Sequence, residues 1–338
     1  MNKIAKLFDK SAPDQAALDA IEAMPEPRRR YLFAMTPRSG SSYLCDVMTK
    51  TRIFGAPGEA LNQEFIPNIA KKIPGRSPDE YLRNFIRAKA GRNGVSGLKA
   101  SWFQFNNFTQ AMGDKAYLGG FKHIYLTRRD LAAQAVSLYK ATSTSVFHTN
   151  IQHGEAAVGK LQALEYDYAE IAKWYEHIVQ QEKGWQAYFM ENRIFPLCVS
   201  YEDIDEDVLG VMKRIATYVG VRPDRVALPK ESSVFKKVSD TRNLEWARRF
   251  ILERNRQGAN IPSFCPFPQV SSPSIVLTPT LKGSLIIPRF IAAMGALMIG
   301  SRWVEPIGPF PSIGFMNGST TRPSRASPTS IIIPVWFG

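Results

Sequence analysis

The chain has 338 residues, 44% of them hydrophobic, which is enough for one large α/β domain or for one domain and an appendage. Its formal net charge of +13 favours an anionic partner such as a nucleotide, a polyanion or a membrane surface, and a merely soluble basic protein is the alternative. Cys45, Cys198 and Cys265 are far apart and form no metal-binding pattern, which argues against a disulfide framework and a zinc site. The charged N-terminus lacks the apolar run of a signal peptide, so we expect a cytoplasmic protein.

Strands and helices are predicted to alternate along most of the chain. Residues 1–30 are expected to form a helical lead-in that ends in a basic hinge. Short apolar runs predict strands at 31–35, 95–101, 123–127 and 195–199. Apolar residues at helical spacing predict helices over 41–51, 131–141, 156–191, 205–219 and 243–255, whereas 53–80 is loop-rich. This alternation predicts an α/β fold with a mostly parallel sheet flanked by helices on both faces.

The composition changes near Phe264. Residues 265–338 are rich in proline, hold one acidic residue, Glu305, and show no helical or strand period. We therefore expect a single domain over 31–264 and an irregular, poorly structured C-terminal tail over 265–338. The apolar stretch within this tail is too short to span a bilayer. The alternative to a poorly structured tail is a segment that makes a peripheral membrane contact.

The segment between the first strand and the first long helix, residues 36–42, reads T-P-R-S-G-S-S. A turn containing Gly40 can aim successive backbone N–H groups at an anion, and the start of the helix adds a partial positive charge. Arg38 supplies a permanent charge, and further hydroxyl donors come from Ser39, Ser41 and Ser42. A Walker A loop would need a lysine before the hydroxyl residues, and none is present. The pattern predicts a phosphate site, with a serine-rich helix cap that binds no ligand as the alternative.

This loop resembles the 5′-phosphosulfate loop of sulfotransferases, whose pattern is close to P-[KR]-S-G-[ST]-[ST]. From Tyr31 to Ile261 the chain resembles the bacterial trehalose sulfotransferase family and related lipopolysaccharide sulfotransferases. The resemblance implies a P-loop-like fold and transfer of a sulfuryl group from 3′-phosphoadenosine 5′-phosphosulfate to a hydroxyl of a carbohydrate or glycolipid. It also implies no metal, because a sulfuryl group carries less negative charge than a phosphoryl group and cationic side chains can suffice.

A second nucleotide signal follows the third predicted strand. Arg129 ends that strand, and Ser137 lies eight residues later on the next predicted helix. The spacing resembles the 3′-phosphate site of sulfotransferases, where an arginine fork and a serine hydroxyl hold the phosphate. Arg128 is the alternative to Arg129. Farther along, Arg242 matches an arginine of the family loop that closes over the 3′-phosphate side.

The catalytic candidates are also implied by the resemblance. Glu59 matches the glutamate of the family's G-x-P-x-E segment, the general base that takes the acceptor proton, and an exposed loop carboxylate is the alternative. Lys99 matches a strand-end lysine that can neutralise the bridging oxygen of the departing nucleotide. Trp102, with Phe103 and Phe105, can form a wall for stacking a sugar, although such rings more often belong to a core.

The remaining candidates concern partners. No histidine shows a triad or metal pattern. His148 is a candidate acceptor contact because it lies beyond the helix that follows Arg129, where we expect the acceptor to bind. Two rival functions stay open: a nucleotide-binding kinase or NTPase, and a non-catalytic nucleotide- or polyanion-binding protein. Nucleic acid is not an expected partner, because the basic residues are scattered and lack an aromatic RNA signature. A homodimer and a membrane contact through the acceptor are left open.

Overall fold

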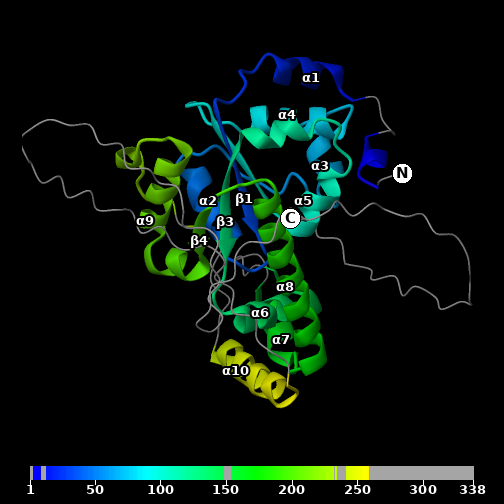
Figure 1. The fold of residues 1–338 in the computed structure, drawn as a ribbon, viewed down its shortest axis with the longest axis vertical. Coiled ribbons are helices and arrows are strands. Elements are labelled where there is room, and N and C mark those ends of the chain that lie inside the picture. The colour runs from blue at the N-terminus through cyan, green and yellow to red at the C-terminus, as the bar shows by residue number, and fades with distance from the viewer. Residues whose placement is uncertain (1–2, 9–12, 148–153, 232, 234–240, 259–338) are drawn as a thin grey trace, which may run out of the picture. The chain divides into compact units, whose positions relative to one another are not determined.

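The computed structural model describes residues 3–8, 13–147, 154–231, 233 and 241–258 (Figure 1). The chain divides into two compact units, Met1–Gln269 and Val270–Gly338, and every described residue lies in the first. The predictions for His148 and for the tail at 265–338 fall outside the described residues. Within the described part, no helix combines the length and the apolar character needed to cross a membrane.

In the described residues four parallel strands form one sheet in the order β2-β1-β3-β4. They are β1 (Arg29–Met35), β2 (Val95–Ser101), β3 (Phe121–Thr127) and β4 (Leu197–Ser200), and the predicted parallel α/β sheet is confirmed. The last strand starts two residues later than expected because Phe195 is 75% exposed and lies outside the sheet. Since all four strands run the same way, their carboxyl ends meet at one edge.

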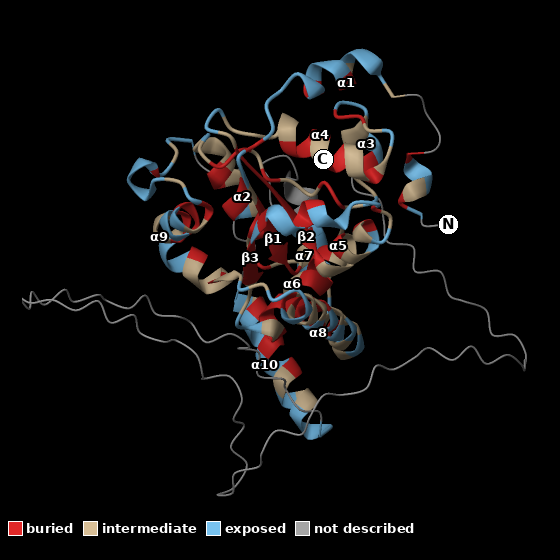
Figure 2. Cartoon of the chain, turned by 45° about the horizontal axis from the view of Figure 1, so that its top comes forward, coloured by how far each residue is buried: buried red, intermediate tan, exposed pale blue. Residues whose placement is uncertain are grey.

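One face of the sheet packs against three helices. Alternate residues of a strand point to opposite faces, and Leu32 and Ala34 of β1 face this layer. The helices that cover it are α4 (Pro78–Ala88), α5 (Trp102–Thr109) and α8 (Tyr168–Glu191). The strands between the layers are buried, as the red ribbons in Figure 2 show.

The opposite face packs against two helices. Tyr31, Phe33 and Met35 of β1 point to this side, where α2 (Ser41–Lys50) and α9 (Tyr201–Val219) complete a second apolar core. The sheet is therefore flanked by helices on both faces, as predicted.

A third apolar cluster lies beyond the carboxyl edge of the sheet. It joins α6 (Leu131–Thr144), the first half of α8 and α10 (Thr241–Arg256), and α7 (Gly154–Ala163) contacts α6. Figure 1 shows these four helices gathered at one end of the strands. The expected single helical region over 156–191 is thus two helices, separated by residues 164–167.

The first half of the chain contains helices that the sequence did not predict, among them α5, and β1 begins at Arg29, within the expected basic hinge. The stretch expected as loops over 53–80 contains α3 (Ile66–Ala70) and the start of α4. Proline suits the first position of a helix, and Ser77 caps α4 by accepting from the backbone N–H of Glu80 at 3.2 Å, so Pro78 begins this helix rather than breaking it. The remaining short elements are η1 (Ala5–Leu7), α1 (Gln15–Glu22), η2 (Lys115–Gly120) and η4 (Pro223–Arg225).

An aromatic cluster fixes α5 against α8. The Trp102 ring lies 5.4 Å from that of Trp185 and 6.3 Å from that of Tyr188, and Phe105 lies 4.9 Å from Trp185. Trp102 covers Gly184 so closely that a Cβ on residue 184 would overlap the indole ring. Two of the three rings expected to form a sugar wall, Trp102 and Phe105, therefore take part in helix packing.

This close approach predicts opposite effects for two helical glycines. Gly159→Ala in α7 meets no atom within 4 Å and is expected to stabilise by up to about 1 kcal/mol, because alanine is the better helix former. Gly184→Ala gains the same propensity but must displace Trp102, so we expect a net loss of roughly 1–3 kcal/mol in the free energy of unfolding. Urea unfolding of the two variants checks this, and equal stabilities would contradict it.

Candidate functional site

The loop between β1 and α2 has an unusual backbone. Arg38 has a φ of 67° and Gly40 a φ of 83°, both in the left-handed region that an arginine seldom occupies. At Gly40 a Cβ would lie 3.0 Å from the Tyr201 ring, so glycine suits both the dihedral and the space. The Ser39 hydroxyl donates to the carbonyl of Thr36 at 2.7 Å and tightens the turn. The loop thereby directs the amino end of α2 to the carboxyl edge of the sheet.

A buried polar network lies under this loop. Thr36 donates to Oε1 of Glu182 at 3.2 Å, and Tyr125 donates to its other oxygen. Gln134 donates to both Thr36 Oγ1, at 2.8 Å, and the Pro37 carbonyl, at 2.7 Å. Burial raises the pKa of Glu182 to about 8, although the bond from Thr36 opposes the shift. No sequence pattern marks Glu182, because a glutamate inside a helix is ordinarily exposed.

The Arg38 side chain extends from the loop towards α6. Its Nε donates to the Ser137 hydroxyl at 3.0 Å, and its Nη1 donates to the carbonyl of Phe147 at 2.6 Å. Arg128 lies beside it, donating to the Arg38 carbonyl at 3.4 Å with its guanidinium 4.3 Å from the centre of the Tyr201 ring. Burial, and then the charge of Arg128, lower the pKa of Arg38 to about 10.

No described carboxylate forms an ion pair with Arg38 or Arg128. Two guanidinium groups of like charge therefore flank the loop, one of them desolvated. An anion held between them and the start of α2 would relieve their repulsion and gain charge-assisted hydrogen bonds. This is the strongest electrostatic reason to regard the loop as an anion site.

Arg129 has different partners from those expected. Its side chain is 64% exposed and contacts the first turn of α9, with Nη2 at 2.9 Å from Oδ1 of Asp203 and 3.2 Å from the hydroxyl of Ser200. Ser137 contacts Arg38 instead of Arg129. Of the two neighbouring arginines, Arg128 is the one that contacts the loop, through the Arg38 carbonyl. The predicted 3′-phosphate pair of Arg129 and Ser137 stays a prediction.

Glu59 reaches the site because its loop adds to the edge of the sheet. Gly58 pairs with Leu98 of β2 as an isolated parallel bridge, and the Lys99 N–H donates to the Gly58 carbonyl at 3.0 Å. One oxygen of Glu59 lies 3.0 Å from Nζ of Lys99, and the same Nζ donates to the Ser42 hydroxyl at 3.0 Å. Three residues separated in the sequence thus form one continuous row.

The second oxygen of Glu59 accepts from two amides, that of Gln104 at 3.2 Å and that of Asn62 at 3.5 Å. Burial opposes ionisation of Glu59, but the charge of Lys99 and these bonds outweigh it, so its pKa lies below the ordinary value. Burial would lower the pKa of Lys99, but Glu59 raises it overall. The pair is therefore ionised at neutral pH. The S-x-x-Q spacing of a capping box is the signal that could have identified Gln104, which caps α5 through Ser101.

Arg242 lies outside these contacts. Its guanidinium donates to the backbone carbonyls of Gln162, at 3.0 Å, and Leu161, at 3.3 Å, and so closes the carboxyl end of α7. The guanidinium also lies over the ring of Trp246, 4.8 Å from the ring centre. The role of Arg242 near the 3′-phosphate stays a prediction.

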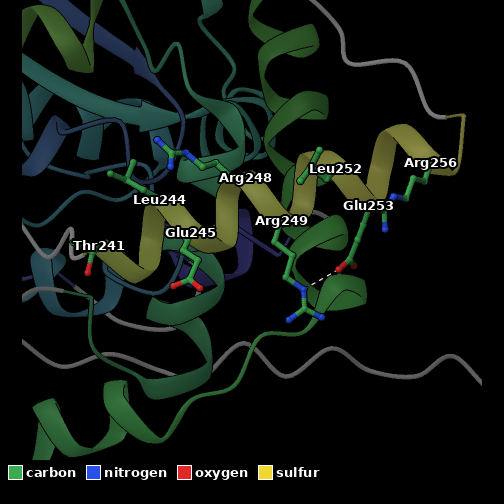
Figure 3. Close-up of a pocket in the computed structure, with 8 residues that line it drawn as sticks. All are labelled: Thr241, Leu244, Glu245, Arg248, Arg249, Leu252, Glu253 and Arg256. Carbon is green, nitrogen blue, oxygen red and sulfur yellow. Dashed lines mark hydrogen bonds and ion pairs between the residues drawn. The ribbon is translucent and has the colours of Figure 1, made fainter.

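A separate hollow of about 550 Å³ lies on the outer side of α10 (Figure 3). Its lining comes from Thr241, Leu244, Glu245, Arg248, Arg249, Leu252, Glu253 and Arg256. No predicted site residue belongs to it, so we do not assign it to the candidate site. Within the described ranges, no cluster of histidine, cysteine and acidic side chains could hold a metal ion.

Comparison with known proteins gives a family. The model of the Stf0 sulphotransferase family matches residues 30–253. Two curated relatives, trehalose 2-sulfotransferases of Mycolicibacterium smegmatis and Mycobacterium tuberculosis, are each 24% identical over 68% of this chain and over 96% and 97% of their own lengths.

Two solved structures are also similar. They are a sulfotransferase from Alicyclobacillus acidocaldarius, at 14% identity and a TM-score of 0.39, and the sulfotransferase domain of the Synechococcus PCC 7002 olefin synthase, at 13% identity and a TM-score of 0.32. The matches cover 69% and 71% of this chain and 97% and 100% of those chains. Similarity at this level carries no argument about the site.

The buried carboxyl of Glu182 predicts a stability that depends on pH. Its pKa is about 8 in the folded chain against an ordinary value of 4.5, so between these values the folded chain holds a proton that the unfolded chain has lost. Stability should fall as pH rises through this window, by up to roughly 1.4 kcal/mol per pH unit. Glu182→Gln is expected to remove most of that fall.

Unfolding by urea at pH 5, 6, 7 and 8 measures the slope of the free energy of unfolding against pH. Glu191→Gln, on the exposed end of the same helix, is the matched control and should keep the slope of the unmodified chain. An unchanged slope in Glu182→Gln would show that this carboxyl does not hold its proton.

Proposed function

Because the chain belongs to the Stf0 sulphotransferase family, we propose that it transfers a sulfuryl group from 3′-phosphoadenosine 5′-phosphosulfate to a hydroxyl of a carbohydrate or glycolipid. The observation that carries this proposal is the row Ser42–Lys99–Glu59, which joins the anion loop to a carboxylate. Trehalose, the sugar named for the two mycobacterial relatives, is the first acceptor to test.

The strand order supports a linear arrangement of donor and acceptor. Along the carboxyl edge, β2 comes first with Glu59 beside it, β1 follows with the loop, and β3 comes next with Arg128 and Arg129 at its end. The 5′-phosphosulfate would lie on Arg38 and the amides of residues 39–42. Its 3′-phosphate would extend to Ser137, Arg129 and Arg242, and the acceptor hydroxyl would lie on the β2 side.

The chemistry would be a direct displacement at sulfur. The acceptor oxygen attacks sulfur, the bond from sulfur to the bridging phosphate oxygen breaks, and the acceptor proton passes to Glu59. Lys99 contacts both Glu59 and the loop, so the charge developing on the bridging oxygen can draw the ammonium away from the carboxylate. Loss of that contact raises the basicity of Glu59 as the proton arrives.

The base assignment predicts a selective loss in Glu59→Gln. The amide cannot accept the proton, so turnover should fall by roughly 100-fold or more, whereas affinity for 3′-phosphoadenosine 5′-phosphate should stay within a few fold. Transfer of radiolabelled sulfate to trehalose and to lipopolysaccharide measures turnover, and calorimetry measures nucleotide binding. Glu64→Gln, in the same loop, is the control and should retain turnover. Unmodified rates in Glu59→Gln would refute the assignment.

The two neighbouring arginines are predicted to have separable effects. Arg128→Ala removes charge beside the loop. It should therefore weaken the binding of 3′-phosphoadenosine 5′-phosphate and of its 3′-dephospho analogue alike, by about 10-fold or more. Arg129→Ala should weaken the binding of the 3′-phosphorylated nucleotide only. Calorimetric titration of both variants with both nucleotides distinguishes them. If Arg128→Ala selectively lost affinity for the 3′-phosphorylated nucleotide and Arg129→Ala did not, the two roles would be exchanged.

A further inference from the structure

Three aromatic rings form a row that the packing of the sheet does not use. The Phe103 ring lies 5.2 Å from that of His177, and the His177 ring lies 5.4 Å from that of Trp174, nearly at right angles. All three are half-buried, as are Trp102 and Tyr188 of the neighbouring cluster, whereas Phe105 and Trp185 at the centre of that cluster are 2% and 0% exposed. The row therefore retains accessible aromatic surface next to a closed core.

The two helices that carry the row also carry residues of the candidate site. Phe103 occupies the first turn of α5 next to Gln104, whose amide donates to Glu59 at 3.2 Å. On α8, His177 precedes Glu182 by five residues, or about 7.5 Å along the axis, and Glu182 contacts Thr36 of the loop. Both supporting helices are thus fixed to the carboxyl edge through residues of the candidate site.

The chemistry of these rings suits an uncharged ligand with apolar faces and hydroxyl groups. Burial lowers the pKa of His177, so its imidazole is neutral at pH 7 and can donate one hydrogen bond and accept another. Phe103 and Trp174 offer flat apolar surface, which suits the C–H face of a pyranose ring.

We propose that Phe103, His177 and Trp174 form the shelf that holds a sugar ring of the acceptor, with its reacting hydroxyl directed to Glu59. This inference rests on the proposed function. The adenine of the donor is the competing occupant, but the arginines and Ser137 that suit a nucleotide lie at the ends of β1 and β3 and on α6. Phe103 precedes Gln104 in α5, and Gln104 bonds to Glu59 beside β2, the side proposed above for the acceptor.

The shelf is tested by removing its rings singly in the full chain. In Phe103→Leu and in Trp174→Leu the KM for trehalose or lipopolysaccharide is expected to rise about 10-fold, with the KM for the donor within two-fold of its original value. Phe103→Tyr keeps the ring and should behave as the unmodified chain. Phe195→Leu removes an exposed ring at the amino end of β4 and is the matched control. Thermal melting verifies that each variant is folded.

Direct binding separates the shelf from the proposed reaction. Saturation-transfer NMR with trehalose or lipopolysaccharide, in the presence of 3′-phosphoadenosine 5′-phosphate, reports sugar binding without turnover. A sugar signal that disappears in Phe103→Leu and persists in Phe195→Leu supports the shelf even if no sulfate is transferred, which would refute the proposed function alone. A raised donor KM with unchanged acceptor KM would assign the rings to adenine, and a sugar signal unaffected by Phe103→Leu would overturn the shelf.

Discussion

The ammonium of Lys99 is the interaction on which the candidate site depends. It is nearly buried, and its two anchors are the Ser42 hydroxyl in the first turn of α2 and the Glu59 carboxylate in the loop after that helix. A buried charge needs such partners, because desolvation would otherwise favour the neutral amine. The same pairing keeps Glu59 ionised, so one contact sets the charge state of the carboxylate and its distance from the loop between β1 and α2.

The loop itself is held in place by groups beneath it. The left-handed backbone at Arg38 is unfavourable in isolation, and it persists where the surrounding contacts define it. Those contacts are Thr36 and Pro37 with Gln134, Thr36 with Glu182, and the ring of Tyr201 against Gly40. The charged groups above the loop thus rest on a buried, neutral network, which limits their freedom before any ligand binds.

The parallel sheet arranges these parts in space. Its strand order brings the segment of Glu59, the loop and the arginines at the end of β3 to one edge, although they are far apart in the chain. The helices beyond that edge add Ser137 on α6 and the aromatic row between α5 and α8. A line from the proposed acceptor shelf to the proposed nucleotide site therefore follows the sheet edge from β2 to β3.

By itself the sequence determined the strands, the parallel sheet with helices on both faces and the turn at Gly40 before α2, because hydrophobic periodicity and glycine placement are local signals. The loop from Thr36 to Ser42 and the membership in the sulfotransferase family could be read directly. Only the tertiary structure decided which arginine faces the loop, that Glu182 is buried under it, and that Trp102 packs against Trp185 whereas Phe103 packs against His177. The direction of a side chain depends on neighbours that are distant in the chain, and no local pattern encodes those neighbours.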